Sequence, residues 1–147
     1  MARYLFDTNI LVYGIDPADV EKQELALETI DRVGLIREGV VPVQALSEFS
    51  RVAMGKLDPP LSAKETFRQI ELYERAFPIL PFTAPIVLEA VRGVRDHGFS
   101  YFDAQIWAAA RLNQIPVVLS EDFRTGTTVE GVTFLNPLAA DFDLALL

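Results

Sequence analysis

Four acidic residues, far apart in the sequence, have neighbours that could bring them into one site. They are Asp7, Glu48, Asp103 and Asp122. Carboxylates that lie close together repel one another, and a divalent cation removes that repulsion. Mg²⁺ and Mn²⁺ prefer oxygen ligands, and they commonly bridge carboxylates and a substrate phosphate. Taken together, the four acids predict a metal site for chemistry at a phosphate.

Asp7 and Asp122 each follow a short apolar run that is typical of a buried strand. Residues 4–6 come directly before Asp7, and residues 116–119 lead into Ser120 and Asp122. In α/β proteins, sites form beyond the carboxyl ends of the strands, so both positions favour chemistry. A second interpretation stays open at the first motif, because aspartate, threonine and asparagine side chains also cap helices.

Asp103 opens a segment, residues 104–110, that is apolar almost all round. Such a helix is typically buried, and an acid on its first turn then lies at the top of the core. Alternatively, Asp103 is a helix-start carboxylate that the helix dipole stabilises, with Ser100 as the cap. The two interpretations are compatible, since the same dipole keeps a carboxylate ionised.

Glu48 belongs to a polar stripe on an expected helix. The stripe consists of Gln44, Ser47, Glu48 and Arg51. Spacings of three, four and seven residues place these side chains on one helix face. One interpretation is a solvent-facing stripe with a Glu48–Arg51 ion pair, and the other adds Glu48 to the acidic site.

Other residue types exclude several kinds of chemistry. The chain has no cysteine, and its one histidine, His97, lies beside Gly98 at an expected helix end. A disulfide and a thiolate zinc site are therefore excluded, and a Ser-His-Asp triad is hard to build. No glycine-rich motif of the Walker or dinucleotide-binding type occurs.

Length and composition predict a single domain over residues 1–147, with 50% hydrophobic residues for its core. Thirteen basic residues against 21 acidic ones give a net charge of −8. That charge argues against simple coating of nucleic acid, and it fits cation binding, a basic partner or plain solubility. No apolar run approaches the ~20 residues of a membrane helix, and the N-terminus lacks the features of a secretory signal. We therefore expect a cytoplasmic protein with no membrane contact.

Strands and helices are expected to alternate, which indicates an α/β fold with a mainly parallel sheet. The expected strands are residues 3–6, 40–43, 79–80, 116–119 and 132–134. The expected helices are residues 17–37, 44–54, 62–76, 84–96 and 100–112. Ser62 and Glu65 form a capping-box pattern, and Pro42 is expected at the edge or end of its strand.

The four acidic motifs, in this order, resemble those of the PIN-domain family, and within it those of the VapC-type toxins of prokaryotic toxin–antitoxin pairs. The matching stretches are FDTNILVY at residues 6–13, VQALSEF at 43–49, SYFDA at 100–104 and LSEDF at 119–123. Gly131 and Asn136-Pro137 also match. Each motif is weak alone, whereas four in register over essentially the whole chain are specific.

The resemblance implies a three-layer α/β/α sandwich on a short, mainly parallel sheet. It also implies a metal-dependent ribonuclease that hydrolyses RNA phosphodiester bonds with water activated by Mg²⁺ or Mn²⁺. The implied metal-binding and catalytic residues are Asp7, Glu48, Asp103 and Asp122. The expected polar helpers are Thr8, Asn9 and Ser120. Either Thr8 or Asn9 is also expected to cap the short helix that follows the first strand.

Partners follow from the same resemblance, which implies a homodimer and a cognate antitoxin protein. Residues 44–54 and 62–76 could form a groove for an amphipathic helix of that partner, whose basic side chain could neutralise the acidic site. The apolar tail, residues 144–147, either packs at an interface or folds back onto its own core. The basic residues expected to contact RNA are Arg51, Lys56 and Arg124, although Arg124 also fits a solvent-exposed loop charge.

Two other functions stay open on the sequence. One is a PIN-type RNA-processing nuclease that has no antitoxin, and a short reading frame beside the gene would argue against it. The other is a non-catalytic binding module with the same fold, which intact acids disfavour and a metal titration would test.

Overall fold

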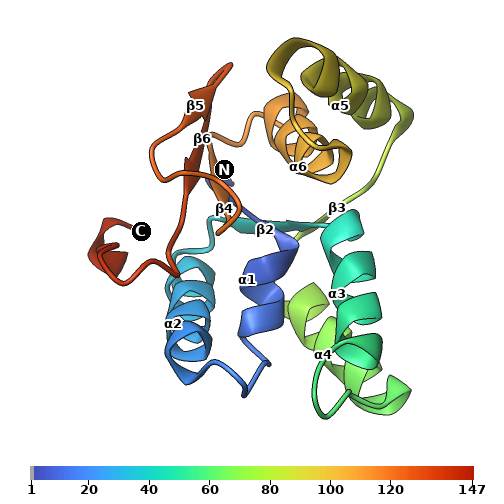
Figure 1. Cartoon of the computed structure of the whole chain (residues 1–147), viewed down its shortest axis with the longest axis vertical. Helices are drawn as coiled ribbons and strands as arrows, with labels where there is room; N and C mark the ends of the chain where they lie inside the picture. The colour runs from blue at the N-terminus through green and yellow to red at the C-terminus, as the bar shows by residue number, and fades with distance from the viewer. Residues whose placement is uncertain (1) are drawn as a thin grey trace.

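Within residues 2–147, which this computed structural model describes, six strands form one sheet with helices on both of its faces (Figure 1). The strands are β1 (Tyr4–Phe6), β2 (Gly39–Pro42), β3 (Ile79–Leu80), β4 (Val117–Leu119), β5 (Thr128–Val129) and β6 (Val132–Leu135). Their order across the sheet is β3-β2-β1-β4-β6-β5. Every neighbouring pair is parallel except β5 and β6. This is the expected mainly parallel sheet.

The helices form two layers, one on each face of the sheet. They are α1 (Thr8–Tyr13), α2 (Val20–Ile36), α3 (Val43–Gly55), α4 (Ala63–Ala76), α5 (Ala84–His97) and α6 (Tyr101–Leu112). Figure 1 shows α1 to α4 below the sheet and α5 and α6 above it. The chain therefore has the predicted three-layer α/β/α architecture.

Successive residues of β1 serve the two layers in turn, because side chains alternate between the faces of a strand. Tyr4 and Phe6 pack into the core between the sheet and helices α1 to α4. Leu5 packs into the other core, around the buried Trp107 of α6. Since both faces of the sheet are covered, the strand reads as a continuous apolar run, as parallel strands do.

The centre of the sheet brings distant parts of the chain to one edge. β1 pairs with β4 in the register Phe6 with Leu119, so both strands end at the same level. The backbone N–H of Asp7 then donates to the Leu119 carbonyl at 3.0 Å. Asp7 and Ser120 consequently leave the sheet side by side.

Helix ends largely follow the predicted signals. Ser62 and Glu65 make both bonds of the capping box, and Gly98 ends α5 in the left-handed conformation at φ 70°. Ser100 caps α6 by accepting from the backbone N–H of Asp103. The prediction that Thr8 or Asn9 caps α1 is wrong. The cap is Asp7, whose carboxylate accepts from the Thr8 N–H.

Apart from shifts of one residue at several ends, two boundaries and one additional strand differ from the prediction. Val43 begins α3 instead of ending β2, so Pro42 lies at the strand end, where its missing N–H costs no ladder bond. Helix α2 starts at Val20, because the Asp19 side chain accepts from the Lys22 N–H and fixes the first turn. The two-residue strand β5 was not expected.

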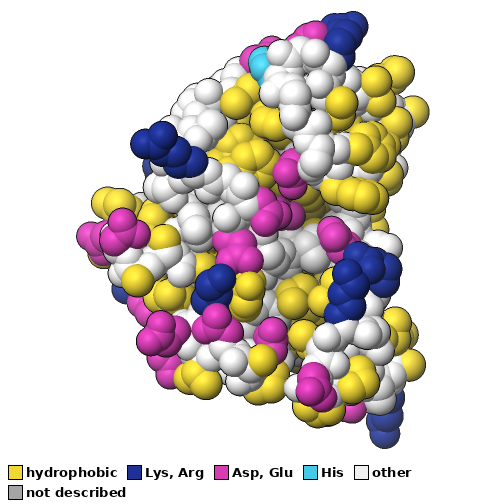
Figure 2. Space-filling model, in the orientation of Figure 1, with side chains coloured by type: hydrophobic (Ala, Val, Ile, Leu, Met, Phe, Trp, Pro, Cys, Tyr) yellow, Lys and Arg dark blue, Asp and Glu magenta, His cyan; other side chains and the backbone are white. Residues whose placement is uncertain are grey.

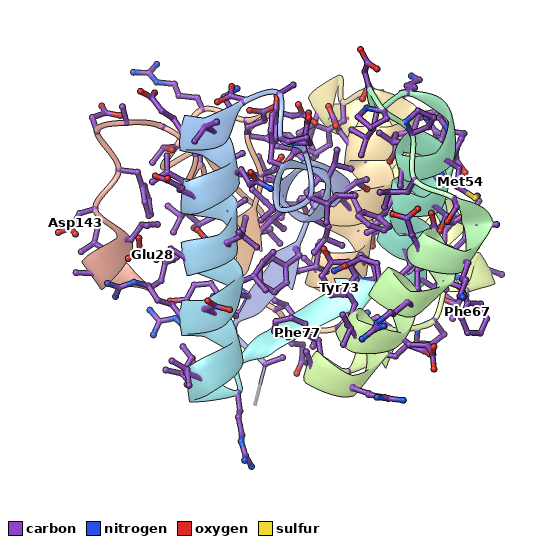
Figure 3. All side chains as sticks on the ribbon, turned by 90° about the horizontal axis from the view of Figure 1, so that it is seen from below. Glu28, Met54, Phe67, Tyr73, Phe77 and Asp143 are labelled. Atoms are coloured by element: carbon purple, nitrogen blue, oxygen red, sulfur yellow. The ribbon has the colours of Figure 1, made fainter. Side chains whose placement is uncertain are left out.

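Helix α4 completes the lower layer through two aromatic side chains. Tyr73 and Phe77 are 5% and 4% exposed, and Figure 3 shows them lying between α4, α2 and the sheet. On the outer side, Met54 of α3 and Phe67 of α4 are exposed. At the chain end, Leu147 packs against this lower core, so the tail folds back. Among the described residues, no helix is both long and apolar enough to cross a membrane.

Candidate metal-binding active site

Three of the four predicted acids meet at the carboxyl edge of the sheet. Asp7, Asp103 and Asp122 each offer a carboxylate oxygen, and these oxygens lie within 4.8 Å of one another. They line a hollow of about 370 Å³, and Glu48 lines the same hollow. Figure 2 shows acidic side chains gathered in the middle of this face of the molecule. The acids come from three separate elements, so the fold rather than local sequence makes the cluster.

Asp7 is the buried member of the cluster, with 5% of its surface exposed. Its carboxylate accepts two hydrogen bonds of 2.7 Å, from the Thr8 backbone N–H and from the Ser120 hydroxyl. The pKa of Asp7 is nevertheless raised to about 7. Burial is the main cause and the negative charges of Asp122 and Asp103 add to it, whereas the two donors oppose the rise. A cation at this point would replace the proton that the carboxylate otherwise holds.

Ser120, which follows β4, holds the backbone of Asp122 in place through hydrogen bonds. The buried Ser120 hydroxyl accepts from the Asp122 backbone N–H at 3.1 Å and from the Asn9 amide at 3.3 Å. The Asn9 side chain in turn accepts from the Glu121 N–H at 3.3 Å. Partial burial, followed by the charge of Asp103, raises the pKa of Asp122 above its ordinary value.

Asp103 reaches the cluster from the first turn of α6. The Ser100 hydroxyl accepts from its backbone N–H at 3.3 Å, so the cap fixes the residue's position. The next seven residues of the helix are buried. Both interpretations of this residue therefore hold, because it is a helix-start carboxylate and also lies at the top of the core.

Glu48 lies beside the three clustered carboxylates and outside their 4.8 Å group. One oxygen accepts from the Thr8 hydroxyl at 3.1 Å, and the other lies 3.8 Å from the Arg51 guanidinium. The side chain is 43% exposed. The predicted ion pair with Arg51 is thus present, and the same residue still faces the acidic hollow.

One contact at the rim of the site was not predicted from the sequence. The Lys22 ammonium lies 2.9 Å from Glu121 and over the Tyr13 ring, 4.8 Å from its centroid. This pairing neutralises the acid next to Asp122. No signal in the sequence links the two residues, because they are 99 positions apart and meet only in the folded chain.

The basic residues expected to contact RNA occupy different places. Lys56 lines the acidic hollow, and Arg51 lines a second hollow beside it. Arg124 is exposed and lines neither of them. His97 ends α5 as expected, and its Nε2 lies 2.6 Å from Glu130, on a different part of the molecule.

This fold and its edge cluster define a known class of protein. The model of the PIN domain family matches residues 4–126, and the chain therefore belongs to the PIN domain family. A comparison of the sequence with curated proteins gives no match.

Solved structures with a similar fold include toxin–antitoxin proteins. VapBC2 from Rickettsia felis, bound to a DNA fragment from its promoter, has a TM-score of 0.63 at 12% identity, covering 89% of this chain and 96% of that one. DNA-bound VapBC from Salmonella typhimurium has a TM-score of 0.64 at 16% identity, covering 91% and 97%. The sarcin-ricin loop cleaving toxin VapC20 from Mycobacterium tuberculosis has a TM-score of 0.60 at 14% identity, covering 78% and 86%. At these identities the likeness establishes the fold.

Proposed function

We propose that this protein is a Mg²⁺- or Mn²⁺-dependent ribonuclease whose metal ligands are Asp7, Asp103 and Asp122. The observation that carries the proposal is the group of three carboxylate oxygens within 4.8 Å of one another. Membership of the PIN domain family supports a nuclease.

The donor set fits a hard divalent cation. All of its atoms are carboxylate oxygens, which Mg²⁺ and Mn²⁺ prefer, and the described residues bring no cysteine or histidine to the cluster. The raised pKa values of Asp7 and Asp122 have the same cause as the expected affinity, since burial and mutual repulsion disfavour uncompensated negative charge. When bound, the ion supplies a Lewis acid for the phosphate and an attacking water with a lowered pKa.

The surrounding residues hold this arrangement in place. Ser120 fixes Asp7 through its hydroxyl, and Asn9 fixes Ser120. Thr8 donates to Glu48 and so holds that carboxylate at the acidic hollow, where it would act as a general base toward water. These contacts support Glu48 and Asp122 as catalytic residues and Thr8, Asn9 and Ser120 as positioning residues.

The negative charge of the site opposes the binding of RNA, whose phosphates are also negative. The acidic hollow is lined by six carboxylates and by one cation, Lys56. A bound divalent ion reduces this charge, and Lys56 is placed to contact a phosphate next to the one that is cleaved. The metal therefore serves both binding and chemistry in the proposed enzyme.

We further propose that the protein is the toxin of a toxin–antitoxin pair, is cytoplasmic and forms a homodimer. Structures of similar fold come from VapBC complexes, which supports an antitoxin partner. The exposed Met54 and Phe67, on neighbouring helices α3 and α4, offer apolar contacts to a helix of that partner.

Two experiments test the proposal. Purified protein should cleave a single-stranded RNA with Mn²⁺, whereas EDTA or Asp103→Asn should abolish cleavage while the circular dichroism spectrum stays native. Induction of the wild type in growing bacteria should arrest growth, and Asp103→Asn should not. Metal-independent cleavage would refute the metal site, and unaffected growth on wild-type induction would refute the toxin.

A further inference from the structure

A second hollow adjoins the acidic one and has a different chemical character. It encloses about 540 Å³ and shares Glu48 and Phe102 with the acidic hollow, so the two lie side by side. The whole polar stripe of α3 lines it, including Gln44, Ser47 and Arg51. The ribonuclease mechanism uses only Glu48 of this stripe.

Two aromatic side chains supply the apolar walls of this second hollow. Phe82, in the segment after β3, is 42% exposed, and Phe102, in the first turn of α6, is 68% exposed. Apolar side chains that gather at one hollow, rather than lying singly on the surface, indicate a site for a ligand or partner. In RNA-binding proteins such rings are platforms on which unpaired bases stack, with little dependence on the identity of the base.

Gln44 is the unexplained polar residue in this wall. Its side-chain nitrogen and oxygen are both buried, and neither has a hydrogen-bond partner. No group among the described residues satisfies this amide, so its donor and its acceptor are both available to a molecule that enters the hollow. Because no hydrogen bond holds the amide in place, it can turn into the hollow without breaking one.

The geometry points to a binding site for one unpaired RNA base next to the cleaved phosphate. A carboxamide offers a donor and an acceptor side by side, which is the pair that glutamine presents to an adenine edge. We therefore propose that the base stacks on Phe82 and Phe102 while the Gln44 amide bonds to its edge. Arg51 lines the same hollow, and its side chain is 61% exposed, so its guanidinium can contact the phosphate attached to this nucleotide.

This inference rests on the proposed ribonuclease function and adds one requirement to its substrate, an unpaired base beside the cleaved phosphate. A base in a duplex is stacked and paired, so it cannot enter the hollow. Glu48 and Phe102 border both hollows, so a base in the second hollow would lie next to the acidic cluster.

A binding experiment with adenosine tests the hollow without any chemistry. Adenosine has no phosphate, so its binding to ¹⁵N-labelled protein in EDTA requires neither metal nor cleavage. We expect the Gln44 side-chain amide resonances to shift on titration, and those of the exposed Gln114 to stay in place. Gln44→Leu should keep the fold, since it replaces an unpaired buried amide with an apolar group of similar shape, and should weaken adenosine binding by about tenfold.

A kinetic experiment separates this inference from the enzyme itself. For wild type, an abasic residue beside the cleaved phosphate should raise KM by roughly tenfold with a smaller change in kcat. Gln44→Leu and Phe82→Ala should cleave intact and abasic RNA with the same KM. RNA cleavage that ignores the abasic residue, together with unshifted Gln44 resonances, overturns the base site and leaves the ribonuclease standing. Adenosine binding in a protein that cleaves no RNA overturns the ribonuclease and leaves the base site standing.

The other candidate occupant of this hollow is a second copy of the chain. If adenosine shifts no resonance and Phe82→Ala converts a dimer into a monomer in sedimentation experiments, the hollow is a contact between copies. That result also overturns the base site.

Discussion

The Ser120 hydroxyl donates a 2.7 Å hydrogen bond to the Asp7 carboxylate across 113 positions of sequence. The bond exists because β1 and β4 are paired neighbours that end at the same level. It is one of two hydrogen bonds to a buried carboxylate that we propose as a metal ligand, and both donors favour its charged form. The strength of the metal site should therefore depend on a residue that does not itself belong to the three clustered carboxylates.

Replacement of this hydroxyl tests that dependence. We expect Ser120→Ala to weaken Mn²⁺ binding by about tenfold to a hundredfold, because partners that orient metal ligands have effects of this size. The lost bond should also lower the free energy of unfolding by about 1 kcal/mol. Calorimetric titration with Mn²⁺ measures the first effect and urea unfolding the second. The matched control is Ser50→Ala, whose hydroxyl bonds only to a carbonyl of its own helix, at Leu46. Equal loss of Mn²⁺ affinity in both variants would contradict the role of Ser120.

The pKa of Asp7 predicts how stability without metal depends on pH. The folded protein holds a proton on Asp7 up to about pH 7, whereas the ordinary carboxyl value is 3.8. Between these values the native state binds the extra proton, so this residue's contribution to stability falls as the pH rises, by at most about 1.4 kcal/mol per pH unit. Compared with Asp7→Asn, which cannot titrate, the wild type in EDTA should lose stability from pH 4 to pH 7. Parallel stability curves for the two proteins would contradict the raised pKa.

Metal binding should show the opposite dependence on pH. An ion competes with the proton on Asp7, so the increase in melting temperature caused by Mn²⁺ should be larger at pH 8 than at pH 5.5. Differential scanning calorimetry at fixed Mn²⁺ concentration measures this difference. If Mn²⁺ raises the melting temperature equally at both pH values, protonation of Asp7 does not compete with metal binding.

Glu48 is the acid with two competing roles, and its substitution distinguishes them. We expect Glu48→Gln to reduce metal-dependent RNA cleavage by about tenfold or more, because glutamine keeps the shape and loses the charge. The stability change should stay within a few tenths of a kcal/mol, since the side chain is partly exposed. The control is Glu28→Gln, which breaks an exposed ion pair with Arg32 on α2 and should leave cleavage unchanged. Full activity in Glu48→Gln would return Glu48 to a purely surface role.

The contact between α5 and α6 should tolerate no added methyl group at Gly93. A Cβ at this position would lie 2.8 Å from the buried Trp107 ring. We expect Gly93→Ala to lower the free energy of unfolding by roughly 1–3 kcal/mol, because overpacking forces side chains out of place. Gly55→Ala is the control, since a Cβ there meets nothing within 4 Å, and it should be neutral or stabilising by about 0.5 kcal/mol. A stable Gly93→Ala protein would mean that this helix pair packs differently.

Local sequence signals explain much of the fold. The apolar run before Asp7, the capping box at Ser62 and the helix-ending Gly98 each act over a few residues, and each predicted its element. Where two local signals competed, the prediction was less accurate. Asp7, Thr8 and Asn9 are all good caps, and only the fold, which aims the Asp7 carboxylate at the Thr8 N–H, selects among them.

From the sequence, the candidate site could be predicted only because its acids follow expected strands or begin an expected helix. The rule that sites lie beyond the carboxyl ends of parallel strands predicted Asp7 and Asp122. It could not predict that Glu48 lies outside the 4.8 Å group, because Glu48 lies on a helix and not at a strand end. The Lys22–Glu121 pair and the unpaired Gln44 amide depend on tertiary contacts that have no sequence signature.

The most direct test of the metal site is anomalous diffraction from a crystal soaked in Mn²⁺. The proposed function requires an anomalous peak between Asp7, Asp103 and Asp122, with carboxylate oxygens in direct contact with it. The same soak of an Asp103→Asn crystal should give a weaker peak or none. A wild-type crystal with no peak at this cluster in millimolar Mn²⁺, or with its peak elsewhere on the molecule, would contradict the central claim.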